Sequence, residues 1–233
     1  MKTIGLLGGM SWESTALYYK HINELVRDEF GGLHSANVLL YSVNFEEIAA
    51  CQRAGDWAKA ASILSEAARS LQAGGADLLL ICTNTMHKIA DEVQAAVSIP
   101  LLNIIDVTAE AIRAQGMSKV GLLGTNYTMS MPFYRERMAE NGIELLVPEE
   151  EQKSVVNAVI FDELCQGVVK DTSREQYQAI MNDLTERGAQ GLILGCTEIT
   201  LLVQDQHARV PLFDSTYLHA KRAVELALEK ARV

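Results

Sequence analysis

The chain has 233 residues, of which 48% are apolar and 21% are charged, and its formal net charge is −10. This length fits one large domain or two small ones, and the composition is that of a globular protein able to bury a core. The negative charge argues against nucleic acid or an anionic membrane surface as a partner, because either would repel it. No stretch reaches the roughly 18 apolar residues that a membrane-spanning helix needs.

Short apolar runs alternate along the chain with longer amphipathic segments. The runs lack polar alternation, which is typical of parallel strands covered on both faces. They predict strands at Thr3–Leu7, Asn37–Val43, Asp77–Cys82, Leu101–Leu102, Lys119–Leu123, Gly191–Leu194 and Pro211–Phe213. The amphipathic segments predict helices at Glu13–Asp28, Asp56–Gln72, Lys88–Ala96, Val107–Ala114, Pro132–Asn141 and Ser215–Ala231. This alternation predicts an α/β fold with right-handed crossovers.

Three segments of the first half recur in the same order in the second half. The pairs are Ile4–Gly8 with Val120–Gly124, Gly75–Thr83 with Gly188–Cys196, and Ile99–Leu102 with Val210–Phe213, at offsets of 116, 113 and 111 positions. At the first offset Tyr18 also meets Tyr134. The alternative explanation of these matches is that the strands of all α/β proteins have similar apolar sequences.

We interpret the repeat as two similar parallel-sheet α/β domains, related by a pseudo-two-fold axis, with the active site in the cleft between them. The expected bounds are 1–103 and 104–214, with the C-terminal helix 215–233 packing back on the first domain. Thr83 and Cys196 occupy equivalent positions just past a central strand of each domain. Because ligands of parallel sheets bind outside the carboxyl ends of the strands, these two side chains are expected to meet one ligand from opposite sides.

The sequence has four cysteines, none in a C-x-x-C pair and none at zinc spacing with histidine. Reduced thiols in a cytoplasmic protein are the simplest interpretation, and no metal is expected. We expect Cys51 and Cys165 to be buried as small apolar residues. Cys196 lies instead at a strand–helix turn, where the positive helix end is expected to lower its pKa and favour the thiolate.

The loops after the predicted strands offer groups that can hold a small anion or amine. Main-chain N–H groups of these turns can bind a carboxylate, and Asn84, Thr85 and Thr197 add side-chain donors. The first strand of each half ends in a glycine loop that supplies Ser11, Thr125 and Thr128, although ordinary helix capping would also explain these three. Neither loop is a nucleotide-binding motif. His87 is expected near Thr85, as a structural residue or as a proton relay.

These residues carry a resemblance to the aspartate/glutamate racemase superfamily, and within it to the aspartate racemase group. The most specific elements are Gly8–Ser11, Thr83–Lys88, Gly195–Glu198 and Phe213–Thr216. The resemblance implies an isomerase that needs no cofactor, binds a free amino acid between two domains and forms a homodimer. By motif, Cys196 matches one of the two family cysteines. The residues expected to contact the substrate are Met10, Ser11, Gln52, Asn84, Thr85, Thr125, Thr128, Thr197 and Glu198.

One position departs from the family pattern. Thr83 stands where the first-half cysteine is normally found, directly before Asn84, and Cys82 lies one residue earlier. In an extended segment this step turns Cys82 to the opposite face, into the core. We therefore expect Thr83 and Cys196 to be the catalytic pair, as in family members that carry threonine here and prefer L-amino acids.

The resemblance favours a racemase that interconverts the enantiomers of aspartate or glutamate by moving the α-proton. A racemase of broad neutral specificity is an alternative, because only Arg53 and Lys88 stand near the motifs as partners for a second carboxylate. A one-cysteine decarboxylase or isomerase of the same superfamily is another alternative. The last is an amino-acid-binding protein without activity.

Overall fold

The structure is a computed structural model that describes residues 1–229 and divides into two compact units. Unit 1 comprises Met1–Ile104 and the segment from His219 onward, and unit 2 comprises Ile105–Leu218. The last positions of the expected C-terminal helix, 230–233, lie outside the described residues. Within residues 1–229, no helix combines the length and the apolar character needed to cross a membrane.

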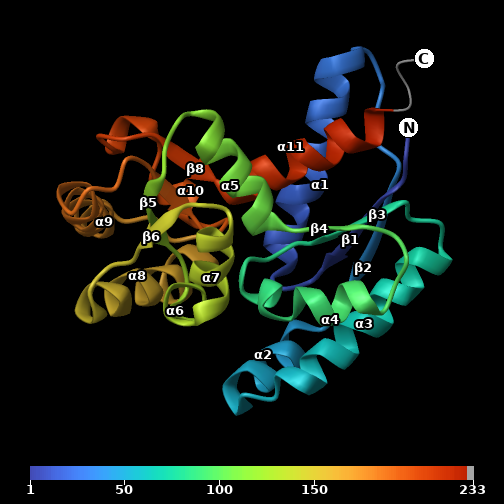
Figure 1. The fold of residues 1–233 in the computed structure, drawn as a ribbon, viewed down its shortest axis with the longest axis horizontal. Helices are drawn as coiled ribbons and strands as arrows, with labels where there is room; N and C mark the ends of the chain where they lie inside the picture. Colours follow the sequence, from blue (N-terminus) through green and yellow to red (C-terminus); the bar gives the residue numbers. More distant parts are fainter. Residues whose placement is uncertain (230–233) are drawn as a thin grey trace. The chain divides into compact units, whose positions relative to one another are not determined.

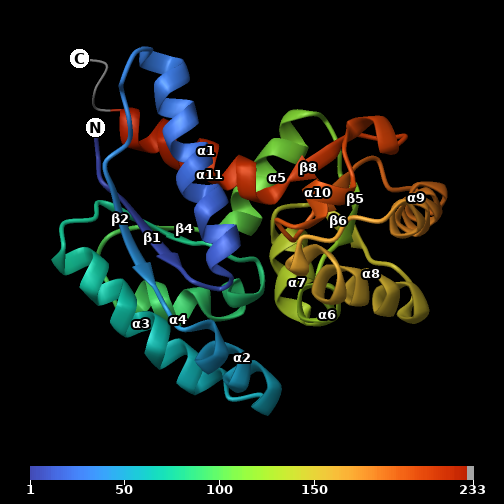
Figure 2. The same ribbon diagram turned by 180° about the vertical axis from the view of Figure 1, so that it is seen from behind.

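Each unit contains one four-stranded sheet whose neighbouring strands are all parallel (Figures 1 and 2). The strands of unit 1 are β1 (Ile4–Gly8), β2 (Val38–Ser42), β3 (Leu78–Ile81) and β4 (Leu101–Leu102), in the order β2-β1-β3-β4. Those of unit 2 are β5 (Lys119–Leu123), β6 (Glu144–Leu146), β7 (Leu192–Leu194) and β8 (Leu212–Asp214), in the order β6-β5-β7-β8. The two orders are the same, which confirms the prediction of two similar parallel-sheet α/β halves.

Helices connect the strands in both units. The first half contains α1 (Trp12–Phe30), α2 (Phe45–Ala54), α3 (Trp57–Ala73), the 3₁₀ helix η1 (Thr85–Ile89), α4 (Ala90–Ala95) and α5 (Ile104–Ala114). The second half contains α6 (Asn126–Ser130), α7 (Pro132–Glu140), α8 (Glu150–Asp162), η2 (Leu164–Gln166), α9 (Asp171–Glu186), α10 (Ile199–Leu202), η3 (Asp205–His207) and α11 (Ser215–Leu228). The helix predicted at Lys88–Ala96 is divided between η1 and α4.

Several of these elements were not predicted: strand β6, the α-helices α2, α6, α8, α9 and α10, and the short 3₁₀ helices η2 and η3. Strand β6 has only three residues and lies at the edge of its sheet, so its apolar run is short. Helices α2 and α9 bury a narrow stripe and are otherwise polar, as in α2, where Ile48 and Cys51 are the buried positions. A weak apolar period of this kind is hard to separate from that of a loop.

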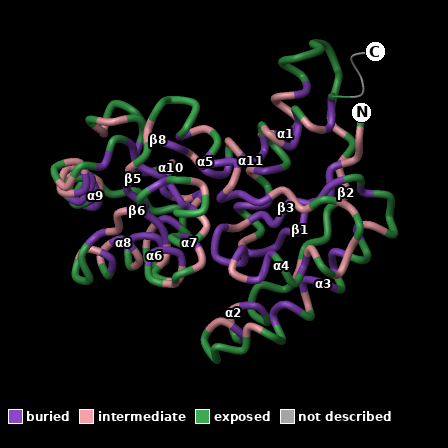
Figure 3. The backbone as a smooth tube through the Cα atoms, viewed as in Figure 1, coloured by how far each residue is buried: buried purple, intermediate pink, exposed green. Residues whose placement is uncertain are grey.

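The central strands of unit 1 are buried on both faces, which explains their continuous apolar runs (Figure 3). Leu7, Leu79 and Ile81 pack into one core cluster with residues of α2, α3 and α4. Leu80 and Cys82 point to the other face and pack into a second cluster with α1 and α11. The period of two along β3 therefore places Cys82 in the core, as expected.

Each sheet is covered by a helix from the other half of the sequence. Helix α11 follows β8 but packs in the core of unit 1, whereas α5 follows β4 and its residues from Ile105 onward belong to unit 2. The two tyrosines of the repeat, Tyr18 and Tyr134, each contact the helix that comes from the other half of the sequence. The Tyr18 hydroxyl is 2.8 Å from His219 Nδ1 in α11, and Tyr134 interacts with Thr108 in α5. Thr108 and His219 are themselves repeat partners, at an offset of 111 positions.

His219 makes the stability of unit 1 sensitive to pH. The side chain is fully buried, and burial, with a smaller effect of neighbouring His87, lowers its pKa from 6.5 to about 3. Below pH 6.5 the unfolded chain therefore binds a proton that the folded chain does not. We expect the contribution of this residue to be complete above pH 6.5 and to be lost toward pH 3, by about 1.4 kcal/mol per pH unit.

Urea unfolding of the wild type and of His219→Gln, between about pH 7 and pH 5, checks this expectation. Carboxylates contribute to the slope in both proteins, so the difference between the two slopes isolates His219. Equal slopes would contradict the assignment of His219 as a buried neutral base.

Candidate functional site

Thr83 and Cys196 directly follow the central strands of the two sheets. Thr83 comes two residues after β3, which lies between β1 and β4, and Cys196 comes two residues after β7, which lies between β5 and β8. Both side chains are half-buried, although the strands before them are fully buried. The structure thus places each of the two residues at the carboxyl end of a parallel sheet, where such folds bind ligands.

The loop after β1 is built from Gly9, Ser11 and Thr15. Gly9 N–H donates to Thr15 Oγ1 at 2.9 Å, and that hydroxyl donates to the Ser11 carbonyl at 2.9 Å. Ser11 Oγ accepts from Ser14 N–H at 3.2 Å and caps α1. Met10 is buried in the unit 1 core. Ser11 therefore caps a helix, which was one of the two roles open for it.

Gly9 is required by the conformation of this loop. Its φ is +90°, and an added Cβ would lie 2.6 Å from the Val43 main-chain nitrogen and clash with the Val43 carbonyl oxygen. We expect Gly9→Ala to lower the free energy of unfolding by about 2–3 kcal/mol, through backbone strain and this clash. Gly31→Ala is the matched control, because Gly31 has φ +73° but open space around it, and should cost only about 1 kcal/mol. If Gly9→Ala and Gly31→Ala lowered the free energy of unfolding by urea equally, the clash with Val43 would not contribute to the cost at Gly9.

The turn after β3 places several polar side chains beside Thr83. Asn84 and Thr85 are buried, and η1 begins at Thr85. Gln52, from the last turn of α2, is half-buried and its Nε2 lies 3.1 Å from Met86 Sδ in η1. The expected substrate contacts Gln52, Asn84 and Thr85 thus belong to segments that adjoin one another in unit 1.

His87 does not fit the role of a proton relay. Its Nδ1 is 2.8 Å from the Thr83 carbonyl oxygen, and its Nε2 accepts from Ile104 N–H at 3.1 Å. The ring is buried and both nitrogens are bonded to the main chain, so neither is directed at the Thr83 hydroxyl. His87 is a structural residue of the Thr83 turn, which was the other expectation for it.

In unit 2, the Cys196 thiol is hydrogen-bonded to the Glu198 side chain. Cys196 Sγ donates to Glu198 Oε2 at 2.9 Å, and Thr197 Oγ1 donates to the same oxygen at 2.6 Å. Desolvation in the protein and the charge of Glu198 raise the pKa of Cys196 well above its ordinary value. The resting residue is therefore a thiol whose hydrogen-bond acceptor is the Glu198 side chain.

This finding corrects the expectation that a helix end lowers the pKa of Cys196. Helix α10 has only four residues, so its positive end is weak, and Glu198 places a full negative charge beside the sulfur. The sequence pattern marked Glu198 as a substrate contact but gave no sign of its hydrogen bond with Cys196. Two further residues, Tyr177 and Cys165, also interact electrostatically with Cys196.

The loop after β5 brings together the remaining predicted residues. Thr125 Oγ1 lies 3.2 Å from Thr128 Oγ1 and accepts from Thr128 N–H, so Thr125 caps the short helix α6. Thr125 is half-buried and Thr128 is buried. As with Ser11, capping accounts for part of what the threonines do.

The other cysteines and the two candidate cations take different positions. Cys51 is buried as expected, whereas Cys165 is exposed, because the 3₁₀ turn η2 leaves its side chain at the surface. Arg53 is exposed and pairs with Glu46. Lys88 Nζ lies 5.3 Å from the centre of the Trp57 ring. The described residues contain no group of three or more histidine, cysteine, aspartate or glutamate side chains that could hold a metal ion.

The chain is similar to known proteins in sequence and in fold. Residues 7–223 match the family described as Asp/Glu/hydantoin racemases. A structure assigned to the Asp/Glu racemases, from Yersinia pestis, is 52% identical and superposes with a TM-score of 0.94, covering 98% of this chain and 100% of that one. An aspartate racemase homologue from Pyrococcus horikoshii is 39% identical with a TM-score of 0.88 and the same coverage.

A relative in sequence is the broad-specificity amino-acid racemase RacX of Bacillus subtilis. It is 24% identical over 231 residues, which cover 97% of this chain and 98% of the relative. The match therefore extends over both halves of the sequence. The chain therefore belongs to the Asp/Glu/hydantoin racemase family.

Proposed function

We propose that this chain is a cofactor-independent racemase of a free amino acid, with Cys196 and Thr83 acting on opposite faces of the substrate α-carbon. The observation that carries the proposal is the equivalent position of the two residues at the ends of β3 and β7, in sheets of the same topology. A racemase needs one proton acceptor and one proton donor on opposite faces, and two such strand ends can supply them.

The pair of Cys196 and Glu198 supports the first proton transfer. The thiol passes its proton to the Glu198 carboxylate, and the resulting thiolate removes the α-proton of the L-substrate. The raised pKa of Cys196 makes this transfer unfavourable in the free protein, so the proposal requires the positive ammonium group of the bound amino acid to favour the thiolate. The electron pair of the broken C–H bond stays on the substrate as a carbanion.

Thr83 completes the inversion on the other face. Its hydroxyl gives a proton to the carbanion, forming the D-enantiomer, and solvent water returns a proton to the Thr83 oxygen. Protonated Glu198 releases its proton to solvent, which neutralises the hydroxide left by that water and restores the resting state. The carbanion must be stabilised, and main-chain N–H groups of the turns can bind the substrate carboxylate for this purpose. The side chains proposed to hold the substrate are Met10, Ser11, Gln52, Asn84, Thr85, Thr125, Thr128, Thr197 and Glu198.

Aspartate or glutamate is the proposed substrate, following the family. A neutral amino acid is the alternative, because Arg53 pairs with Glu46 and Lys88 lies against Trp57, so both candidate cations for a second carboxylate have other contacts. The RacX relative is named a broad-specificity racemase, which supports testing amino acids beyond aspartate and glutamate. A screen would show interconversion of the aspartate or glutamate enantiomers in the first case and of the enantiomers of a neutral amino acid in the second.

The test is a chiral-chromatography screen of all common L- and D-amino acids with the purified chain and no added pyridoxal phosphate. Conversion of at least one pair supports the proposal. Release of carbon dioxide from a malonate-like acid would favour a one-cysteine decarboxylase over the racemase. Loss of the double bond of a maleate-like acid would favour a one-cysteine isomerase. A ligand-induced rise in melting temperature without turnover would replace it by a binding protein.

We further propose that the protein is a cytoplasmic homodimer. All four cysteines are free, as suits a reducing compartment. Edge strand β2 exposes Leu40 and Tyr41, which offers an apolar surface to a second copy. A monomer in sedimentation velocity would overturn the proposed homodimer. Export of the chain in cell fractionation would overturn the cytoplasmic location.

A further inference from the structure

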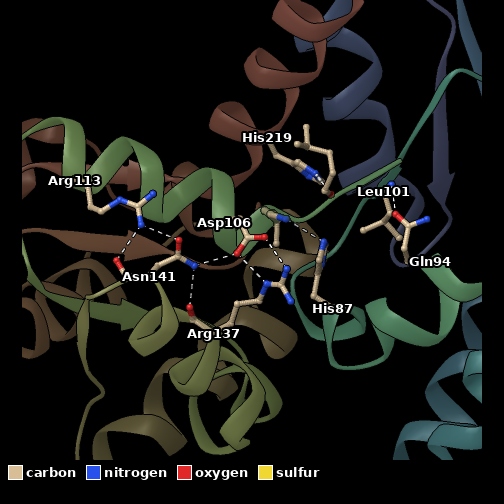
Figure 4. A network of polar contacts seen from close by, with 10 residues as sticks. His87, Gln94, Leu101, Asp106, Arg113, Arg137, Asn141 and His219 are labelled. Atoms are coloured by element: carbon tan, nitrogen blue, oxygen red, sulfur yellow. Dashed lines mark hydrogen bonds and ion pairs between the residues drawn. The ribbon is translucent and has the colours of Figure 1, made fainter. Parts of the chain in front are cut away.

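His87, labelled in Figure 4, holds two main-chain groups that lie far apart in the sequence. Its Nε2 accepts from the N–H of Ile104, the last residue of unit 1 before the chain enters unit 2. Its Nδ1 lies 2.8 Å from the carbonyl oxygen of Thr83. The side chain is buried and comes from η1, directly after the turn that carries Thr83.

These contacts fix the proton on the ring. A main-chain N–H can only donate, so Nε2, which faces the Ile104 N–H, carries no proton. A neutral imidazole then holds its proton on Nδ1, which donates to the Thr83 carbonyl. The ring therefore acts as a donor toward Thr83 because Ile104 occupies its other nitrogen.

A second histidine holds the same chain segment with the opposite arrangement. His219 Nε2 is 2.8 Å from the Leu102 carbonyl oxygen, and its Nδ1 is 2.8 Å from the Tyr18 hydroxyl. The ring centroids of His87 and His219 are 5.8 Å apart, and their planes meet at 68°. Residues on both sides of Asn103 are thus tied to the core of unit 1, which gives His87 a rigid anchor.

We propose that His87 is a positioning residue for Thr83, which it holds by donating the Nδ1–H proton to the Thr83 carbonyl while the Ile104 N–H orients the ring. The inference rests on the proposed function, in which the Thr83 hydroxyl delivers a proton to the substrate. The turn of Thr83 lies between the last residue of β3 and the first residue of η1, so regular secondary structure does not fix its carbonyl. A displacement of about 1 Å at a reacting group can cost about 100-fold in rate.

The test compares two substitutions that each keep one end of the imidazole. In His87→Asn the amide N–H can take the place of Nδ1–H and still donate to Thr83. In His87→Gln the amide oxygen can take the place of Nε2 and accept from Ile104, and the donor to Thr83 is lost. The measured quantity is the ratio of two rates in D₂O: exchange of the α-proton in recovered L-substrate, and inversion to the D-enantiomer.

We expect His87→Gln to lower inversion about 100-fold while exchange in the L-substrate stays within about threefold, because Cys196 and Glu198 are untouched. His87→Asn should restore inversion to within about tenfold of the wild type. A general loss of folding would lower exchange and inversion together and leave their ratio unchanged. A ratio in His87→Gln equal to that of the wild type would overturn the inference.

Gln94→Ala is the matched control. Gln94 also ties the β4 segment, by accepting from Leu101 N–H at 2.7 Å and donating to the Ile99 carbonyl at 3.0 Å (Figure 4), and these hydrogen bonds go to a segment other than the Thr83 turn. Its loss should lower the melting temperature without changing the ratio. A changed ratio in this variant would also count against His87, since any weakening near β4 would then have the same effect.

An NMR measurement on the wild type does not depend on the folding of a variant. Nitrogen shifts of the imidazoles should show His87 protonated at Nδ1 and His219 at Nε2. A His87 proton on Nε2 would overturn the inference. A wild type that shows neither exchange nor inversion for any amino acid would overturn the racemase proposal itself, which separates the two failures.

Discussion

Replacement of Cys196 by alanine is expected to abolish racemisation, with a fall in kcat/KM of about 1,000-fold or more in both directions. An acid–base group that acts directly on the reacting carbon contributes about 10²- to 10⁴-fold. Because the equilibrium constant of a racemisation is one, the ratio kcat/KM must fall equally for the L- and the D-enantiomer. Exchange of the α-proton in L-substrate should be lost as well, since Cys196 is the proposed base on that face.

Cys82→Ala is the matched control for this variant. Cys82 is also a thiol after a central strand, but it is fully buried in the core of unit 1, and burial raises its pKa far above the ordinary value. The substitution should cost about 1 kcal/mol of stability and leave most of the activity. Chiral chromatography and urea unfolding measure the two effects. More than about a tenth of the wild-type activity in Cys196→Ala would contradict a base at this position.

Replacement of Thr83 by valine should separate inversion from exchange. Valine keeps the shape of threonine and removes the hydroxyl, so we expect inversion to fall about 100-fold while the L-substrate continues to exchange its α-proton with solvent. The exchange persists because the thiol of Cys196 can return a solvent-derived proton to the face from which it took the first one. Thr83→Ser keeps the hydroxyl and should restore inversion to within about tenfold of the wild type.

The same D₂O assay measures both rates for Thr83→Val. If exchange and inversion fell together, the hydroxyl would be needed for binding or for carbanion stability rather than for proton delivery. If neither fell, Thr83 would have no part in the reaction. Comparison with His87→Gln is informative, because loss of the hydroxyl and loss of its positioning should shift the ratio of the rates in the same direction.

The sequence predicted the parts of the fold that depend on burial. Strands β1, β3, β5 and β7 are central and covered on both faces, so their composition is apolar throughout and their ends lie within a residue or two of prediction. Edge strand β6 and helix α9 present much of their surface to solvent, and their composition carries little period. The internal repeat located the equivalent turns of Thr83 and Cys196, because matching the two halves of the sequence does not depend on secondary-structure propensity.

The polar contacts of the site could not be predicted in the same way. Glu198 accepts a hydrogen bond from the Cys196 thiol because the turn folds back over two residues, and several turn geometries fit the same sequence. The partner of His87 is 17 positions away and belongs to the segment after β4, so only the folded chain brings the two together. Side-chain direction at turns depends on such tertiary contacts, which local pattern does not encode.

The central claim is that a thiol and a hydroxyl, which differ greatly as acids, serve the two faces of one carbon. The most direct test is the initial rate at which deuterium from D₂O appears in each recovered enantiomer, for the wild-type protein. Cys196 releases its proton to solvent through Glu198 while the slower Thr83 has yet to act, so the account predicts that recovered L-substrate gains deuterium faster than it inverts, whereas recovered D-substrate gains almost none. Equal gain in both recovered enantiomers would contradict it.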